Sequence, residues 1–228
     1  AANFSPMAEA FGEELDYKYF DKLDFERMED LNLTILYIPD EWAGSASVCK
    51  EQIIDMMRDN HIEKFDIAHM HGMFDFQIPE VGEHPLKHDS EWFHEIVRSY
   101  INIGHDHTFK TQGRILVQGS FDRIAHGEEG RKGGIVCHLR RDGESVFEFI
   151  ENKRARTFKT CRVRVRDLDA GIAQVRKVLD ALPDNSHIRI SSAKDNPIFT
   201  VMDEFKRAHP RMKFKKHEDK YQENEEKR

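Results

Sequence analysis

Three short apolar segments, each followed by residues that stop a strand, constrain the fold of this chain more than any other feature. They cover residues 32–38, 65–70 and 100–103, and they run into Pro39, His71-Gly72 and Gly104. Segments of this length and composition are typical of buried strands. Residues 47–60 separate the first two segments and carry their apolar side chains at helical spacing. The order strand, helix, strand predicts an α/β fold.

The later segments predict antiparallel strands and then a second, smaller unit. Strands are expected at 114–118, 134–139 and 146–150, the last two joined as a hairpin through Arg141-Asp142-Gly143. Beyond them, strands at 160–165, 187–191 and 212–215 alternate with helices at 168–182 and 197–208, which predicts a βαβαβ unit. Residues 14–30 carry apolar side chains at roughly helical spacing, and a short helix is expected at 91–99.

The charge of the chain changes sign at about residue 152. Residues 1–152 contain 15 Lys and Arg against 30 Asp and Glu, a balance of −15, whereas residues 153–228 contain 20 against 12, a balance of +8. The last twelve residues hold no aliphatic side chain. We therefore expect a first domain over 1–152, a basic domain over 153–216 and a disordered charged tail over 217–228.

Composition excludes a membrane-spanning chain and favours a reducing compartment. No apolar run approaches the roughly 20 residues that a membrane-spanning helix needs. The three cysteines, Cys49, Cys137 and Cys161, are odd in number and widely spaced, which predicts no disulfide framework. We therefore expect a cytoplasmic protein.

Histidines at the ends of the predicted strands indicate a metal site. Gly104 is followed by His105-Asp106-His107, and in an extended chain residues i and i+2 share a face about 6.5 to 7 Å apart. The two imidazoles could each bind one ion of a pair set ~3.5–4 Å apart, while Asp106 points away. His71 offers a third nitrogen at the end of 65–70, with His69 on the same face as a competitor. The alternative is a polar loop with two exposed histidines.

A pair of divalent ions also needs anionic ligands, and no carboxylate motif in the sequence supplies them. Imidazoles neutralise none of the ions' positive charge, so such sites use carboxylates, usually one that bridges both ions. Asp59-Asn60-His61 has the letters of a ligand pair but follows a predicted helix instead of a strand. Asp66 and Asp75, which flank the strand of His71, remain candidates.

Basic residues open the second domain. Between residues 153 and 166 the chain has seven Lys and Arg and no acid. Alternation with period two places Arg162, Arg164 and Arg166 on one face of the predicted strand and the apolar residues between them on the other. Together with Lys159 they suit phosphate contacts made without sequence readout. The alternative is a solvated face whose cations pair with acids elsewhere in the chain.

Three segments resemble the later motifs of calcineurin-like metallophosphoesterases, most closely the SbcD-type DNA repair exonucleases. They are Phe65–Gly72, Tyr100–His107 and Val117–Val136. The resemblance implies a β-sandwich flanked by helices, of which this chain holds the later half, with the βαβαβ unit as a capping domain that binds DNA. It also implies two Mn²⁺ ions, with His71 as one ligand and His105 and His107 as one ligand to each ion. Ser120 and Arg123 would belong to a substrate loop.

The chain departs from that family in its first half. A strand that ends in Asp-x-His and the motifs Gly-Asp-x-x-Asp and Gly-Asn-His-Asp supply the family's remaining ligands, and none of them stands in this sequence. We therefore expect the later portion of such an enzyme, separated by truncation, a split gene or a late start site.

The resemblance implies metal-dependent phosphodiester hydrolysis on DNA, as the exonuclease subunit of a repair or recombination complex. The implied partners are DNA, an SbcC-type coiled-coil ATPase and a second copy of the chain. Two alternatives stay open. One is a non-catalytic module that binds DNA or a partner on a decayed phosphoesterase scaffold. The other is a phosphodiesterase for small substrates, against which the basic second domain argues.

Overall fold

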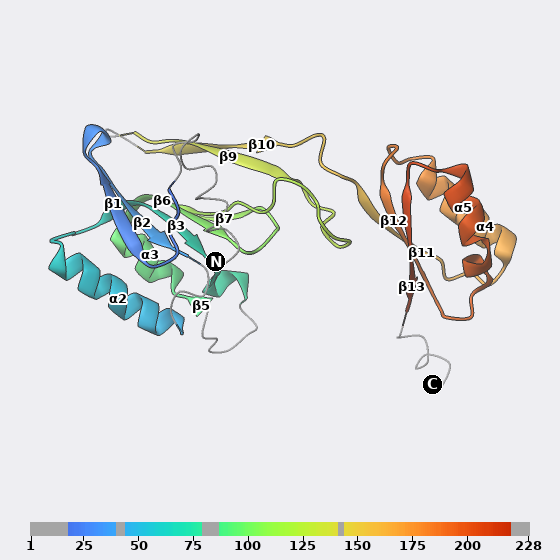
Figure 1. Ribbon diagram of the computed structural model, residues 1–228, viewed down its shortest axis with the longest axis horizontal. Helices are drawn as coiled ribbons and strands as arrows, with labels where there is room; N and C mark the ends of the chain where they lie inside the picture. The colour runs from blue at the N-terminus through green and yellow to red at the C-terminus, as the bar shows by residue number, and fades with distance from the viewer. Residues whose placement is uncertain (1–17, 40–43, 79–86, 141–143, 220–228) are drawn as a thin grey trace. The chain divides into compact units, whose positions relative to one another are not determined.

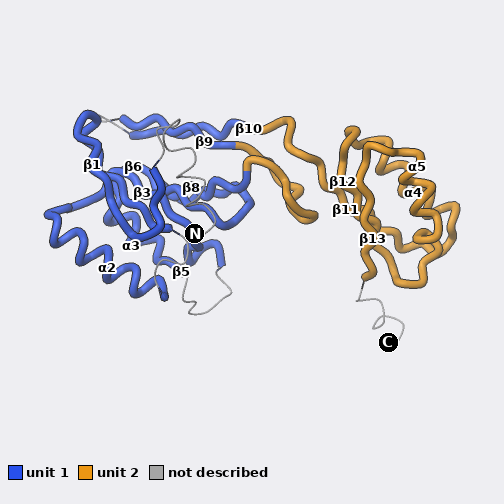
Figure 2. Tube along the Cα trace, viewed as in Figure 1, with its two compact units in different colours: residues 1–120, 134–150 blue, residues 121–133, 151–228 orange. Residues whose placement is uncertain are grey.

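The computed structural model describes residues 18–39, 44–78, 87–140 and 144–219, which belong to two units (Figures 1 and 2). Unit 1 consists of residues 1–120 and 134–150, and unit 2 of residues 121–133 and 151–228. The segment 121–133 therefore groups with unit 2, although it precedes the change of charge at residue 152.

Unit 1 is built on a six-stranded mixed sheet with the strand order β1-β2-β3-β6-β8-β7. The four central strands are parallel, and β1 and β7 pair antiparallel at the two edges. The predicted α/β class is therefore confirmed. The strands are β1 (Asp24–Met28), β2 (Leu33–Ile38), β3 (Phe65–His71), β6 (Val97–Gly104), β7 (Lys110–Gln112) and β8 (Ile115–Val117).

Two helices, α2 (Ala46–Asp59) and α3 (Ser90–Ile96), connect the parallel strands and cover one face of the sheet (Figure 1). Ser45 and Asp89 begin them, because their side chains accept hydrogen bonds from the free backbone N–H groups of the first turn. Both crossovers lead in the same direction across the sheet, so a common hand places both helices on one side. Their buried residues, such as Ile53 and Phe93, share one core with Leu36 and Ile101 of the sheet.

A two-stranded sheet of β9 (Gly133–His138) and β10 (Val146–Glu151) lies on the other face of the six-stranded sheet (Figure 1). Phe147 packs edge-on against Tyr100 of β6 with ring centroids 6.4 Å apart, and Phe149 stacks on Phe109 at 4.2 Å. Unit 1 thus has three layers, which are the helices, the six-stranded sheet and the pair β9-β10. The remaining short elements of unit 1 are η1 (Glu29–Leu31), β4 (Met73–Phe74), η2 (Asp75–Gln77) and β5 (Lys87–His88).

Unit 2 has the βαβαβ order that the sequence predicts. Its three strands are all parallel, in the order β11-β12-β13. Strand β13 extends two residues into the segment expected to be a tail, and residues 220–228 lie outside the described part of the chain. The elements are β11 (Phe158–Arg162), α4 (Leu168–Leu179), β12 (His187–Ser192), η3 (Pro197–Val201), α5 (Met202–Ala208) and β13 (Lys213–Glu218).

The structure differs from the sequence prediction in the segment that includes residues 24–28. The helical spacing at 14–30 is misleading, because residues 24–28 form β1 and pair antiparallel with β2; residues 14–17 are not described. Pairing with a neighbouring strand overrides a weak local pattern. Strand β7 has no sequence signal, and the turn at 141–143 lies outside the described residues. Within the described ranges, no helix has the length and apolar character to cross a membrane.

Candidate metal centre and basic segment

His71 and His105 meet at the carboxyl ends of two neighbouring parallel strands. His71 is the last residue of β3 and pairs in register with Gly104, the last residue of β6. His105 follows directly, and its ring lies edge-on to that of His71, with centroids 5.2 Å apart and planes at 79°. Parallel strands bring their ends to the same edge of a sheet, so two histidines 34 residues apart in sequence place their imidazoles side by side.

The glycine between the two histidines makes room for the first of them. A Cβ atom on Gly104 would lie 3.0 Å from Cδ2 of His71. Any larger residue at position 104 would therefore displace the His71 ring or the strand. The residue after it has an unusual backbone, because φ of His105 is 104°. Such a conformation costs about 1–3 kcal/mol in a residue other than glycine, and strain of this kind is often found at functional sites.

His107 lies two residues further along, with an exposed side chain. Its carbonyl oxygen accepts a hydrogen bond from the backbone N–H of Ser120 at 3.3 Å. The loop before Ser120 approaches closely at Gly119, where φ is 74° and a Cβ would lie 2.8 Å from the Phe109 nitrogen. Only glycine fits this contact. Gly119 therefore allows the backbone before Ser120 to lie against the backbone of residues 107–109.

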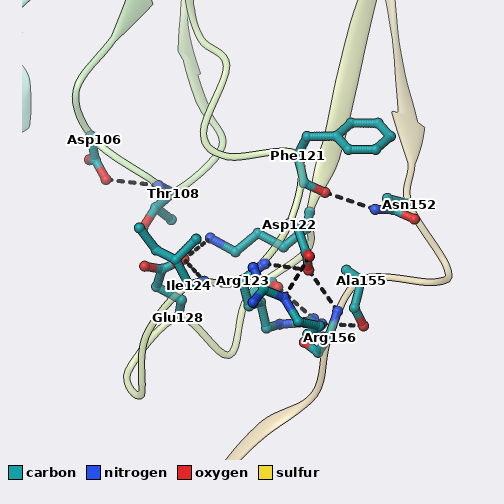
Figure 3. Close-up of polar contacts among 12 residues, drawn as sticks. Asp106, Thr108, Phe121, Asp122, Arg123, Ile124, Glu128, Asn152, Ala155 and Arg156 are labelled. Carbon is teal, nitrogen blue, oxygen red and sulfur yellow. Dashed lines mark hydrogen bonds and ion pairs between the residues drawn. The ribbon is translucent and has the colours of Figure 1, made fainter. Parts of the chain in front are cut away.

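Asp106, which lies between the two histidines in the sequence, makes hydrogen bonds of its own. Its two carboxylate oxygens accept from the Thr108 backbone N–H at 2.9 Å and from Lys110 Nζ at 2.8 Å; Figure 3 shows the bond to Thr108. Partial burial disfavours the charged carboxylate, but the contacts with Lys110 and Thr108 outweigh it and lower the pKa of Asp106. Asp106 is thus ionised but already occupied.

The other carboxylates considered in the sequence lie elsewhere or make local bonds. Asp66 is at the amino end of β3, roughly 16 Å of extended strand from His71, and it accepts hydrogen bonds from Thr34 and Arg98. Asp59 ends α2, which returns the chain to that same edge of the sheet, and it pairs with Arg58 at 3.2 Å. Asp75 bonds the backbone N–H of Phe76.

The donors that the structure brings together do not complete a metal shell. Among the described residues, no group of three or more His, Cys, Asp or Glu is close enough to hold a metal ion. His71 and His105 supply two neutral nitrogens, whereas a manganese pair also needs carboxylate oxygens. The residues present therefore fit one part of a metal site and not the whole of it.

The other histidines of this region are structural or remain outside the pair. His88 is buried between Phe74 and Phe93, with ring centroids 6.1 and 5.7 Å away. Burial lowers its pKa to about 4, so it is neutral at pH 7. His69, the sequence's competitor for His71, stacks on Tyr37 at 5.8 Å.

The basic segment of unit 2 follows the predicted alternation over part of its length. Cys161 and Val163 are buried, and Arg162, Arg164 and Arg166 are exposed, but β11 ends at Arg162 and Val165 is 42% exposed. Two of the predicted DNA contacts are in ion pairs: Lys159 with Glu129 at 2.8 Å and Arg166 with Asp195 at 3.0 Å.

Arg123, expected in a substrate loop, fastens the segment 121–133 within unit 2 (Figure 3). Its guanidinium donates to the carbonyl oxygens of Gly130 at 2.9 Å and Arg156 at 3.1 Å. The neighbouring Asp122 accepts from the backbone N–H and the Nε of Arg156 at 2.6 and 2.8 Å. These bonds give Arg123 and Asp122 a structural role that sequence spacing could not show.

Comparison with known proteins does not assign this chain to a family. A scan against protein-family models finds none that matches the chain, and a search of curated proteins finds no significant match.

Proposed function

We propose that this chain takes part in metal-dependent hydrolysis of phosphodiester bonds in DNA and contributes the histidine side of the metal site. The single observation that carries the proposal is the contact of His71 and His105 across the ends of β3 and β6. A ligand pair that comes from two strand ends, next to a strained backbone at His105, is a typical arrangement for a site in an α/β protein.

In this proposal each residue has a limited role. His71 and His105 bind metal through neutral ring nitrogens, and His107 binds the second ion. Bound Mn²⁺ would supply an activated water and neutralise charge on the phosphate oxygens. The missing carboxylates come from outside the described residues or from a second chain. Lys159, Arg162, Arg164 and Arg166 hold the DNA backbone, Ser120 and Arg123 belong to the substrate loop, and an SbcC-type ATPase, a homodimer and a cytoplasmic location stay predictions.

The test is a cleavage assay of the full chain on end-labelled DNA with Mn²⁺. We expect nucleotide release that EDTA stops and that His105→Ala abolishes. The matched control is His138→Ala, which removes an exposed histidine of β9. Equal release with and without EDTA, or from the His105→Ala variant, would overturn the proposal.

A second candidate function is a non-catalytic module that binds DNA. It is favoured by the absence of a three-residue ligand group among the described residues. In the cleavage assay such a module releases no nucleotide. It still binds the DNA, and Arg164→Gln weakens that DNA binding.

A further inference from the structure

The three-stranded sheet of unit 2 has one covered face and one open face. Helices α4 and α5 cover the first, where Ile188, Ile190 and Cys161 share a core with Val175 and Phe205. In parallel strands, residues paired in register point to the same side, and successive residues alternate. The residues between the buried ones therefore form the open face.

The open face carries cations on all three strands. The register aligns Phe158, His187 and Lys213 in one row and Thr160, Arg189 and Lys215 in the next. The third row is Arg162, Ser191 and His217. None of these nine positions is an acid, but in the third row the buried Ser191 donates its hydroxyl to Asp219 at 2.5 Å. The part of the face without a carboxylate is therefore formed by the first two rows, with their Arg, Lys and His groups.

The segment 121–133 turns the first two rows into a pocket. A hollow of about 380 Å³ lies between residues 124–126 and the open face, within unit 2. The groups that give it its character are His126, His187, Arg189, Lys213, Lys215 and the ring of Phe158. No carboxylate lines it. We call it the cation pocket.

The two histidines of the cation pocket pack on the ring of Phe158 and lie within the influence of the neighbouring cations. His126 lies edge-on to Phe158 at 5.1 Å, and Phe158 stacks on His187 at 4.3 Å. Burial, then Arg189, Lys215 and His187, lower the pKa of His126, and only Glu129 opposes them. Burial, then Lys213 and Arg156, lower the pKa of His187 against Asp122. Within the described residues, Nδ1 of His126 is buried and has no hydrogen-bond partner.

We propose that the cation pocket binds the dianionic phosphate group of a phosphate monoester. Three permanent cations and two histidines line this pocket, and Glu129 and Asp122 act on the histidines without lining it. A group with two negative charges on one centre would match the charge of this lining. A phosphate monoester carries about −1.5 to −2 at pH 7 and offers three acceptor oxygens, whereas a phosphodiester carries one charge. Arg189, already oriented by its hydrogen bond to Thr160 at 3.1 Å, presents the planar donors that phosphate oxygens prefer.

Monoester binding by the cation pocket extends the proposed function. Only the connection between this binding and DNA cleavage rests on that function. When water attacks a phosphodiester, a new P–O bond forms, the bond to the leaving oxygen breaks, and that oxygen takes a proton. One fragment then ends in a phosphate monoester and the other in a hydroxyl group. A pocket that prefers the monoester would hold the phosphorylated end after cleavage. Binding of the monoester itself needs no metal.

The experiment measures binding to the full chain in EDTA. The probes are thymidine monophosphate, thymidine, inorganic phosphate, and a short oligothymidylate with either a 5′-phosphate or a 5′-hydroxyl. We expect the monophosphate to bind and thymidine not to bind. Lys213→Gln with Lys215→Gln should weaken monophosphate binding roughly tenfold or more, because it removes two charge-assisted contacts. Both lysines are exposed, so the variant should fold.

The matched control is Arg176→Gln with Lys177→Gln. It removes the same charge from exposed positions of α4, which covers the opposite face of the sheet. We expect a change of less than about twofold, because these charges are screened by solvent. Tighter binding of the 5′-phosphorylated oligonucleotide than of the 5′-hydroxyl form identifies a strand end as the source, and equal affinity for free phosphate and thymidine monophosphate identifies the free anion; either supports the pocket.

Equal loss in the two double variants, or equal binding of thymidine and its monophosphate, would overturn the cation pocket. The result is separable from the proposed function, because EDTA removes metal chemistry from the measurement. His105→Ala should leave monophosphate binding unchanged even where it abolishes cleavage.

Discussion

Gly104 lies against the ring of His71 so closely that a Cβ on residue 104 would fall 3.0 Å from His71 Cδ2. This contact ties the end of β6 to the orientation of the first histidine. It gives a physical reason for the glycine before His105, because the His71 ring from the neighbouring strand occupies the space that a side chain at position 104 would need.

Gly104→Ala should therefore disturb the histidine pair without removing a ligand. We expect the free energy of unfolding to fall by about 1–3 kcal/mol, the usual cost of an added methyl group in a packed place, and Zn²⁺ affinity to fall about tenfold, as when a ligand loses its supporting contact. Urea denaturation and calorimetric titration measure the two effects. Gly134→Ala, where a Cβ meets nothing within 4 Å, is the control. Unchanged Zn²⁺ affinity in Gly104→Ala would contradict the role of this contact.

His88 should make unit 1 less stable in mild acid. Burial lowers its pKa to about 4, whereas an unfolded histidine titrates near 6.5. The unfolded chain therefore binds more protons between these values, so this contribution is complete above pH 6.5 and is lost as the pH falls toward 4. The loss is at most about 3 kcal/mol.

The measurement for His88 is the difference in unfolding free energy between pH 7 and pH 5. His88→Leu keeps an apolar side chain among Phe74 and Phe93 and should reduce this difference, whereas His138→Ala should not. A wild-type pH dependence that persists in His88→Leu would show that another group is responsible.

Asp122→Ala should loosen the segment 121–133 of unit 2. The carboxylate accepts from the backbone N–H groups of Arg123 and Arg156 and from Arg156 Nε. Partial exposure limits the loss, and we expect about 1 kcal/mol in stability together with faster proteolysis within 121–133. Asp195→Ala, which breaks an exposed pair with Arg166, should change neither quantity. The same cleavage rate in both variants would contradict this role of Asp122.

Arg164 should contact DNA phosphate more effectively than Arg166. Arg166 pairs with Asp195, and Arg164 has no ion pair within the described ranges. Each phosphate contact contributes about 0.9 to the slope of log affinity against log salt on duplex DNA. Arg164→Gln should therefore reduce that slope by roughly one, and Arg211→Gln, which breaks an exposed pair with Asp184, should leave it unchanged. Equal slopes for wild type and Arg164→Gln would count against the phosphate contact.

The sequence was most informative where an apolar segment and its stop signal lie together. The strand at 65–70 followed by His71, and the βαβαβ order after residue 158, are in the structure because local patterns and burial agree there. Residues 24–28 were misjudged, since an edge strand depends on its partner more than on its own pattern. The contact of Gly104 with His71 needed the register of β3 with β6, which no local pattern encodes.

The cation pocket also could not be predicted from the sequence. His126 and His187 are 61 residues apart and each stood alone, and the segment 121–133 precedes the change of charge that marked the boundary. The sequence predicts that Arg162 and Arg164 lie on one face of their strand. Which residues of β12 and β13 lie beside them depends on the pairing of the three strands. Long-range register, and not composition, places these cations on one face.

The most direct test of the metal-site proposal is a Zn²⁺ titration of the full chain and of His71→Ala, His105→Ala and His138→Ala, followed by calorimetry. Zn²⁺ binds imidazole nitrogen more strongly than Mn²⁺ does, so it reports the histidine pair even where carboxylates are missing. We predict one saturable site in the wild type and in His138→Ala, weakened at least about tenfold by each of the other two substitutions. Identical titrations for all four proteins would contradict a metal site built on His71 and His105.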